Sequence, residues 1–209
     1  MEYDATCKDC ERLSTFLTEV KNKHPDYFCK PVPSFGKKNS RFLIVGLAPG
    51  MHGANKTGRP FTGDHAGILL YKTLYKYGFS NLETSQSLDD NLILNNCRIT
   101  NAVKCLPPEN KPNHEEINNC NKFLQSEINQ LKQGSILLAL GLIAHNSIMT
   151  SLGLIKREYK FSHGRRHNLP NNIVMYDSYH CSRYNTQTKR LTEKMFQEVF
   201  LSIKTEMES

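Results

Sequence analysis

Apolar positions along the chain follow two patterns, one typical of amphipathic helices and one of buried strands. Between residues 11 and 23, Leu13, Phe16, Leu17 and Val20 recur at helical spacing and form one apolar stripe. The segment 41–47 (R-F-L-I-V-G-L) is instead a short continuous apolar run, as in a strand of a parallel sheet that is buried on both faces. Further helices are predicted over 66–77, 113–133, 141–151 and 192–204, and further strands over 98–103, 135–140 and from 173 to 176.

This alternation of strands and helices predicts an α/β fold with a mainly parallel sheet. A chain of 209 residues is predicted to form a single domain, residues 1–209. The polar segment 81–96 is predicted to be an excursion on the surface. Polar motifs follow the predicted strands directly, so we expect them to meet at the carboxyl ends of the strands, where open α/β sheets bind ligands.

Composition and charge narrow the class of protein. The formal net charge of +7 suits a polyanionic partner, although a basic protein without such a partner is the alternative. The apolar runs are too short to span a bilayer. The first ten residues also lack the basic region followed by an apolar region that a secretory signal peptide has. Seven cysteines, an odd number, argue against a secreted disulfide framework. We therefore expect a protein that stays in the compartment where it is made, with some of its thiols bound to metal.

Four cysteines in two clusters are the strongest chemical signal. Cys7 and Cys10 form a C-x₂-C pair, Cys105 closes the run T-N-A-V-K-C-L-P-P, and Cys120 follows in the next predicted helix. Four thiolates from two distant segments indicate a metal site. Thiolates suit zinc and iron–sulfur clusters alike, so the residues alone leave the metal open. A structural role is favoured over a redox role, because no electron-transfer partner site is evident.

A Gly-rich loop, G-L-A-P-G-M-H-G-A-N-K-T-G-R-P-F-T-G-D, directly follows the first apolar run. It lacks the G-K-[ST] of a Walker loop and the glycine spacing of a dinucleotide-binding fingerprint. Glycines let backbone amides approach a ligand closely, and His52, Asn55 and Asp64 add polar side chains. The alternative is a plain connection between strand and helix, in which Asp64 serves as the helix N-cap.

A second polar motif, S-Y-H-C-S-R-Y-N-T-Q-T-K-R-L-T, spans residues 178–192. Hydroxyl, amide and Arg side chains of this kind contact phosphate backbones. With two arginines further upstream, its basic residues are predicted to form a rim; the set is Arg165, Arg166, Arg183, Lys189 and Arg190. The alternative is a solvated loop.

Together these segments resemble the uracil-DNA glycosylase superfamily, and within it family 5, the B-type iron–sulfur enzymes. The Gly-rich loop resembles the first family motif. The central segment of the family is similar to T-N-A-V-K-C-L-P-P-E-N-K-P together with Cys120, and the second family motif is similar to H-C-S-R-Y-N-T-Q-T-K-R-L-T. Family 4 has Glu after the first glycine, where this chain has Leu47, as in family 5. Cys181 stands where the second motif usually has Pro, which predicts a softer loop around His180.

The resemblance implies a three-layer α/β/α sandwich with a central four-stranded, mainly parallel sheet. It implies a 4Fe-4S cluster held by Cys7, Cys10, Cys105 and Cys120. The implied activity is that of a monofunctional DNA glycosylase, which flips uracil out of DNA, hydrolyses its N-glycosidic bond and leaves an abasic site for base excision repair. Hypoxanthine and xanthine are expected as further substrates. We expect a cytoplasmic, nucleoid-associated monomer of a prokaryotic cell that acts on DNA and not at a membrane.

The resemblance also implies roles for single residues. His180 is expected to donate a hydrogen bond to uracil O2 as charge develops there, and a core histidine is the alternative. Phe61 is expected to stack on the base, Asn101 to recognise its edge, and Asp64 to activate water. Other expected base contacts are Ala48, Gly50, His52 and Asn55, and expected DNA contacts are Ser182, Arg183, Asn185, His163, Lys189 and Arg190.

Two rival functions fit the same residues. One is a DNA-binding iron–sulfur protein without catalytic activity. The other is a zinc-stabilised enzyme that acts on free nucleosides or nucleotides.

Overall fold

The structure is a computed structural model that describes residues 2–208. The strands in this range are β1 (Phe35–Gly36), β2 (Phe42–Gly46), β3 (Cys97–Asn101), β4 (Ile136–Leu140), β5 (Arg166–Asn168) and β6 (Val174–Ser178). The α-helices in the same range are α1 (Glu11–Lys23), α2 (Ala54–Thr57), α3 (His65–Lys76), α4 (His114–Asn129), α5 (Leu142–Ser151), α6 (Arg183–Gln187) and α7 (Glu193–Glu208). Short 3₁₀ turns lie at Pro108–Asn110, Lys156–Glu158 and Pro170–Asn172.

The strands of residues 2–208 form one sheet in the order β1-β3-β2-β4-β6-β5. The four central strands are parallel, as predicted, and a short antiparallel strand extends the sheet at each edge. Gly46 pairs with Asn101, and Leu140 pairs with Ser178, so the central strands end at the same edge of the sheet. The motif residues that follow these strands are thereby brought to one side of the molecule.

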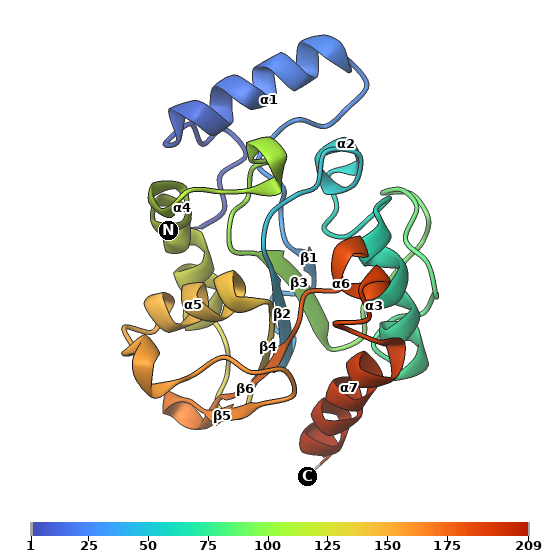
Figure 1. Cartoon of the computed structure of the whole chain (residues 1–209), viewed down its shortest axis with the longest axis vertical. Helices are drawn as coiled ribbons and strands as arrows, with labels where there is room; N and C mark the ends of the chain where they lie inside the picture. The colour runs from blue at the N-terminus through green and yellow to red at the C-terminus, as the bar shows by residue number, and fades with distance from the viewer. Residues whose placement is uncertain (1, 209) are drawn as a thin grey trace.

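Helices cover both faces of the sheet (Figure 1). Ile44 and Leu138 point into a core shared with α3 and α7, whereas their neighbours Leu43 and Leu137 point into a core shared with α4 and α5. Alternate residues of one strand face opposite sides, so burial on both faces favours the apolar sequences of β2 and β4. The three-layer α/β/α arrangement is confirmed.

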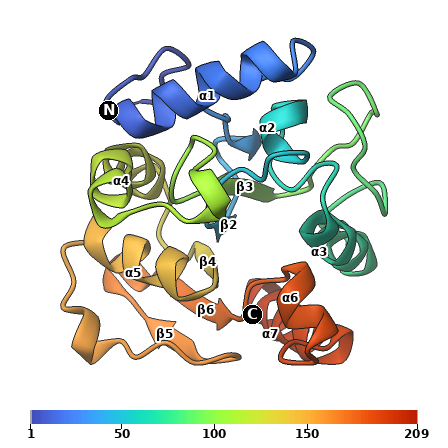
Figure 2. The same cartoon turned by 45° about the horizontal axis from the view of Figure 1, so that its top comes forward.

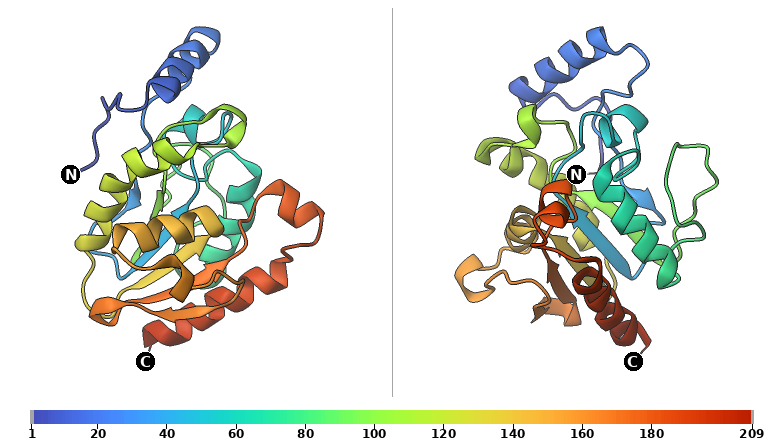
Figure 3. Two further views of the ribbon diagram at one scale, coloured as in Figure 1. Left: turned by 60° about the vertical axis from the view of Figure 1, so that its left-hand side comes forward. Right: turned by 45° about the vertical axis from the view of Figure 1, so that its right-hand side comes forward.

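The N-terminal helix α1 lies at the opposite end of the molecule from the C-terminus (Figure 3). Its apolar stripe packs into two small clusters, with Leu17 and Val20 in one and Leu13 in the other. The segment after α1 runs along the Gly-rich loop, where Cys29 N donates to Asn55 O at 3.1 Å. The N-terminal segment is therefore tied directly to the first motif.

Element boundaries differ from the predictions at several places. Helix α4 has the predicted capping box between Asn113 and Glu116, but it ends at Asn129 rather than at residue 133. Helix α7 continues past the predicted end, to Glu208. The excursion is irregular, with a single antiparallel bridge from Ser80 to Leu94. None of the helices within residues 2–208 has the length and apolar character that a membrane crossing requires.

Candidate active site

A cavity of about 390 Å³ opens at the carboxyl ends of the central strands, where the motifs meet. Figure 2 shows α2, α3 and α6 grouped on the right-hand side of the view. Predicted site residues make up most of the cavity wall. The lining residues are Leu47, Ala48, Gly50, Ala54, Phe61, Asp64, His65, Ala66, Asn101, Asn110, His180, Ser182 and Arg183.

Phe61 forms an apolar wall of the cavity and is held by two glycines. Its side chain is 5% exposed, and its φ of 55° lies in the left-handed region, which is unusual for a bulky residue. A Cβ at Gly46 would come within 2.6 Å of the Phe61 ring, and a Cβ at Gly67 within 1.8 Å of its carbonyl oxygen. Both glycines are therefore required for this placement of the ring.

Asn101 ends β3 beside Gly46 and is almost completely buried. Its Oδ1 has no hydrogen-bond partner among the residues that the structure describes. A buried acceptor without a partner typically costs about 1–3 kcal/mol. Since Asn101 lines the cavity, a ligand that offers an N–H there would recover this free energy.

His180 lies two residues beyond the end of β6, with its ring centroid 5.9 Å from that of Phe61 and the rings inclined by 27°. The Nδ2 of Asn185 donates to the main-chain oxygen of His180 at 2.8 Å. Burial lowers the pKa of His180 to about 4. The ring is therefore neutral near pH 7 and offers one N–H donor.

Asp64 serves as the N-cap of α3 and also faces the cavity. Its Oδ1 accepts a hydrogen bond from Gly67 N at 2.8 Å. Its other oxygen lies against the Gly-rich loop, where a Cβ at Gly53 would come within 2.5 Å of it. Burial raises the pKa of Asp64, and the N–H groups of Gly67 and Ala66 oppose that shift. Capping uses one oxygen, so the geometry is compatible with either predicted role.

Two predicted base contacts lie outside the cavity. His52 is exposed, and its Nδ1 is 2.8 Å from the hydroxyl of Tyr27. Asn55 is fully buried in α2, and its Nδ2 donates to Cys29 Sγ at 3.4 Å. Both side chains therefore contact the N-terminal segment, His52 from the loop before α2 and Asn55 from its single turn.

The second motif turns into α6 at the mouth of the cavity. Ser182 is the N-cap of α6, and its Oγ accepts from Asn185 N at 3.4 Å. Arg183 is exposed and lines the cavity. Lys189 is exposed with a φ of 57°, and the guanidinium of Arg190 lies 4.7 Å from the ring centroid of Tyr179. Of these residues, Ser182 and Arg183 line the cavity.

His163 and the upstream arginines are further from the cavity. The His163 ring stacks on Tyr179 with centroids 5.1 Å apart, and its Nδ1 accepts from Tyr179 N at 3.2 Å. Burial lowers the pKa of His163. Arg166 forms a bidentate ion pair with Glu206 at 2.8 Å, so this part of the predicted rim is engaged within the protein.

Cys181, which replaces the expected Pro, is fully buried in the core beside α7. Burial raises the pKa of its thiol, with the charge of Asp64 adding to the effect. Packing of this side chain and the hydrogen bond from Asn185 to His180 both hold the loop. The loop is therefore fixed by tertiary contacts rather than by a proline ring.

Sequence reasoning missed three residues around the cavity. His65 and Asn110 line it, and Tyr184 on α6 is 70% exposed, next to Arg183. His65 adjoins Asp64, and Asn110 lies within the central segment P-E-N-K-P. Their positions within the motifs could therefore have identified both as candidate cavity residues. The exposed aromatic side chain of Tyr184 could be recognised only from the structure.

The four predicted metal ligands gather in one place. Cys7, Cys10, Cys105 and Cys120 share an apolar cluster and line one small cavity. Lys104 N donates to Cys120 Sγ at 3.2 Å, and burial raises the pKa of each of the four thiols. Backbone N–H donors to sulfur are common around bound thiolates. The donor set therefore fits a soft metal centre.

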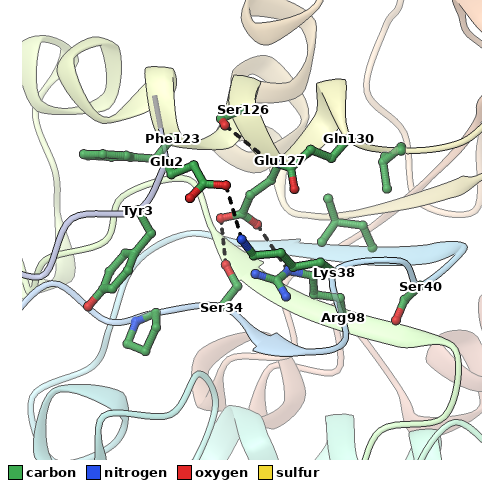
Figure 4. Close-up of a pocket in the computed structure, with 13 residues that line it drawn as sticks. Glu2, Tyr3, Ser34, Lys38, Ser40, Arg98, Phe123, Ser126, Glu127 and Gln130 are labelled. Atoms are coloured by element: carbon green, nitrogen blue, oxygen red, sulfur yellow. Dashed lines mark hydrogen bonds and ion pairs between the residues drawn. The ribbon is translucent and has the colours of Figure 1, made fainter.

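A buried ion pair supports the loop that carries Cys105. The ammonium of Lys104 pairs with Glu127 Oε1 at 2.7 Å and also donates to Thr100. Glu127 accepts from Ser34 Oγ at 2.7 Å as well, at the edge of a second cavity between α4 and the sheet (Figure 4). Since Lys104 directly precedes Cys105, this network fixes the backbone around Cys105.

Comparison with known proteins agrees with this geometry. The family described as the uracil DNA glycosylase superfamily matches residues 33–204. The chain therefore belongs to the uracil DNA glycosylase superfamily, and its enzyme class is that of DNA glycosylases.

Relatives of known type narrow the assignment to one family within the superfamily. The chain is 42% identical over 203 residues to a type-5 uracil-DNA glycosylase of Thermus thermophilus, covering 95% of this chain and 92% of that protein. It is 39% identical over 197 residues to a type-5 enzyme of Pyrobaculum aerophilum, covering 92% and 85%. It is 37% identical over 208 residues to one of Mycobacterium leprae, covering 96% and 91%. The resemblance to family 5 is confirmed.

Proposed function

We propose that this protein excises uracil from DNA by hydrolysis of the N-glycosidic bond. The observation that carries the proposal is the convergence of Phe61, Asn101 and His180 on one cavity, each from a different strand end or motif. The cavity offers an aromatic wall, a free buried acceptor and a neutral N–H donor. These are the groups that a flipped pyrimidine requires. The relatives named type-5 uracil-DNA glycosylase support the same substrate.

Base recognition follows from Phe61 and Asn101. A base stacked on the Phe61 ring gains on the order of 1–3 kcal/mol. Uracil presents an N3–H donor, which matches the unpartnered Oδ1 of Asn101. The backbone from Ala48 to Gly50 closes the cavity beside them and contributes further polar groups. This set favours a base with a donor at that edge.

His180 stabilises the departing base. Cleavage of the N-glycosidic bond leaves negative charge on the base and positive character on the sugar. A neutral His180 donates its N–H to uracil O2 as that charge grows, without a proton having to leave the enzyme first. A preorganised donor of this kind contributes roughly 3–4 kcal/mol to the transition state.

Asp64 is the proposed water-activating group. The oxygen that does not cap α3 lies at the cavity wall, on the side of the Gly-rich loop. A carboxylate there attracts water and stabilises the positive sugar. Leu47 supplies no polar group at the position after the first glycine, so Asp64 is the carboxylate within the motif that reaches the cavity.

The cysteine cluster is proposed to hold a 4Fe-4S cluster through Cys7, Cys10, Cys105 and Cys120. The apolar surroundings of the four thiols and the relatives named type-5 uracil-DNA glycosylase support this assignment. Ala48 packs against these cysteines and also lines the active-site cavity. The cluster thus braces the first motif and needs no redox step to serve this role.

DNA is proposed to lie across the mouth of the cavity. Ser182, Arg183, Asn185, Lys189 and Arg190 are the proposed contacts, and His163 acts through Tyr179. Phosphate contacts by the basic residues make binding salt-dependent, with a slope of about −0.9 per contact. We further propose that residues 1–209 act as one domain and one monomer, at the nucleoid in the cytoplasm of a prokaryotic cell.

Deaminated purines are proposed as further substrates. The cavity is open to solvent on one side, and apolar residues, among them Leu47, Ala54 and Phe61, form much of its wall. Hypoxanthine and xanthine present an N1–H donor that Asn101 could bind. Their removal, like that of uracil, leaves an abasic site that base excision repair would process.

The test uses labelled duplex DNA with one uracil opposite guanine and anaerobically purified protein. Alkali cleavage at the uracil is expected, and His180→Ala is expected to slow it by about 10²–10³-fold. His114→Ala is the matched control, because His114 is exposed at the start of α4. If the folded wild-type protein bound DNA without releasing any base, the non-catalytic DNA-binding function would replace this proposal.

A further inference from the structure

The irregular excursion between α3 and β3, residues 81–96, contacts the first motif through one buried arginine. Arg59 is 3% exposed although it belongs to the Gly-rich loop. Its Nη1 donates to Asp90 Oδ1 at 2.7 Å and to Ser85 Oγ at 3.0 Å, and its Nη2 donates to Leu88 O at 2.8 Å. The excursion, seen beside α3 at the right of Figure 1, thus encloses the guanidinium.

Asp90 organises the excursion as well as pairing with Arg59. Its Oδ1 also accepts from Leu92 N at 3.0 Å, and its Oδ2 accepts from Gln86 N at 2.8 Å and Ser87 N at 3.3 Å. Burial raises the pKa of Asp90, but Arg59 and these N–H groups together lower it to about 2. The carboxylate therefore stays ionised and fixes both sides of the contact.

The residues on either side of Phe61 are fixed by the excursion and by α3. Thr62 Oγ1 and Ser85 Oγ are 2.6 Å apart, which joins the motif to the excursion a second time. Pro60 O accepts from the hydroxyl of Tyr71 at 2.9 Å. Together with the contacts of Arg59, these hydrogen bonds anchor the two residues before Phe61 and the one after it.

Phe61 itself needs such anchors. A left-handed φ costs a bulky residue on the order of 1–3 kcal/mol and persists only where the surroundings impose it. The Phe61 side chain lines the cavity, so a relaxed backbone would turn the ring away from it. The contacts of the excursion oppose that relaxation.

We propose that Asp90 and Ser85 are positioning residues for base excision, which hold Phe61 against the flipped base through Arg59 and Thr62. The excursion is then part of the base-recognition machinery rather than a passive surface loop. This inference rests on the proposed stacking role of Phe61.

The first variant to measure is Asp90→Asn, which keeps the size of the side chain and removes its charge. The single-turnover rate of uracil excision is expected to fall by about tenfold, because small displacements of a positioned group cost one to two orders of magnitude. Asp89→Asn is the matched control, since Asp89 is the exposed neighbour of Asp90. It is expected to retain the wild-type rate.

A double-mutant cycle with Phe61→Ala separates positioning from general destabilisation. In the Phe61→Ala background, Asp90→Asn is expected to change the rate by less than about twofold, because the ring that it positions is gone. A merely structural role would slow both backgrounds by the same factor. Melting temperatures of all four proteins are recorded alongside, and if Asp90→Asn does not fold, the cycle is run with Ser85→Ala.

The outcomes distinguish this inference from the proposed function. If Phe61→Ala excises uracil at the wild-type rate, the stacking role of Phe61 fails and the inference fails with it. If Phe61→Ala is impaired while Asp90→Asn matches Asp89→Asn, or slows both backgrounds equally, the proposed function stands and the positioning role is overturned.

Discussion

Replacing Gly46 by Ala tests the placement of two base-contacting side chains at once. Gly46 is the last residue of β2 and pairs with Asn101 across the sheet. A Cβ at this position would lie 2.4 Å from Asn101 Oδ1 and 2.6 Å from Phe61 Cζ. Ordinary contacts to a Cβ begin at 3.4 Å, so each side chain would have to move by about 1 Å.

The cost of these shifts divides between stability and activity. Overpacking of a buried site typically costs about 1–3 kcal/mol of unfolding free energy. Displacement of a reacting or binding group by about 1 Å can reduce the rate by about 10²-fold. We therefore expect Gly46→Ala to fold with reduced stability and to excise uracil about 10²-fold more slowly than the wild-type protein.

The assay measures single-turnover excision with enzyme in excess, together with denaturant unfolding of the same samples. Gly50→Ala is the matched control for folding, because the nearest atom to its added Cβ would be 3.6 Å away, an ordinary contact. It is expected to unfold at the wild-type midpoint. A folded Gly46→Ala protein with a rate within threefold of wild type would refute the placement of Phe61 and Asn101 against the base.

Three further predictions concern other parts of the molecule. Asp64→Asn keeps an N-cap of equal quality, so excision should fall at least 10²-fold with little change in melting temperature, whereas a pure capping role predicts an unchanged rate. Glu127→Gln leaves the Lys104 ammonium buried without its partner and should cost about 3–5 kcal/mol in denaturant unfolding, with Ser126→Ala as control. Burial alone would raise the pKa of Glu127, but the larger opposing effect of Lys104 and its other partners leaves that pKa below its ordinary value. The ion pair therefore stabilises the fold at pH values above the ordinary carboxyl range. That stability is lost as pH falls through the lowered pKa, and unfolding between pH 7 and pH 3 should show a larger loss for wild type than for Glu127→Gln. Cys105→Ser should abolish broad absorption near about 400 nm and bound iron, whereas Cys29→Ser should retain both; a colourless wild-type protein would contradict the cluster.

Local patterns were sufficient for the main elements. The apolar stripe from Leu13 to Val20 predicted α1 at its observed bounds, and the capping box at Asn113 predicted the start of α4. Continuous apolar runs located β2 and β4, because burial on both faces favours apolar residues along the whole strand. The strands β3 and β6 also carry buried polar residues, among them Asn101 and Asp177. The edge strands β1 and β5 have two and three residues, too few for any period to be recognised.

The site was predictable where a residue follows directly from a strand end. Asn101 and His180 reach the cavity for this reason, and Asp64 both caps α3 and lines the cavity. His52 and Asn55 belong to the same motif, but their side chains contact the N-terminal segment, and composition carries no information on that contact. The ion pair between Arg59 and Asp90 joins residues that are far apart in sequence, so only the folded chain reveals it.

The short edge strands have a consequence for how the protein behaves at high local concentration. An open sheet exposes unpaired N–H and C=O groups at its edges, where a strand of another molecule can add. Here the outermost strands are β1, which ends in a glycine at φ 105°, and β5, which carries Arg166 paired with Glu206. Edge strands this short, with a bend in β1 and a charged residue in β5, present few backbone hydrogen-bonding groups to an incoming strand. Edge-to-edge pairing between copies of the protein is therefore disfavoured at both margins of the sheet.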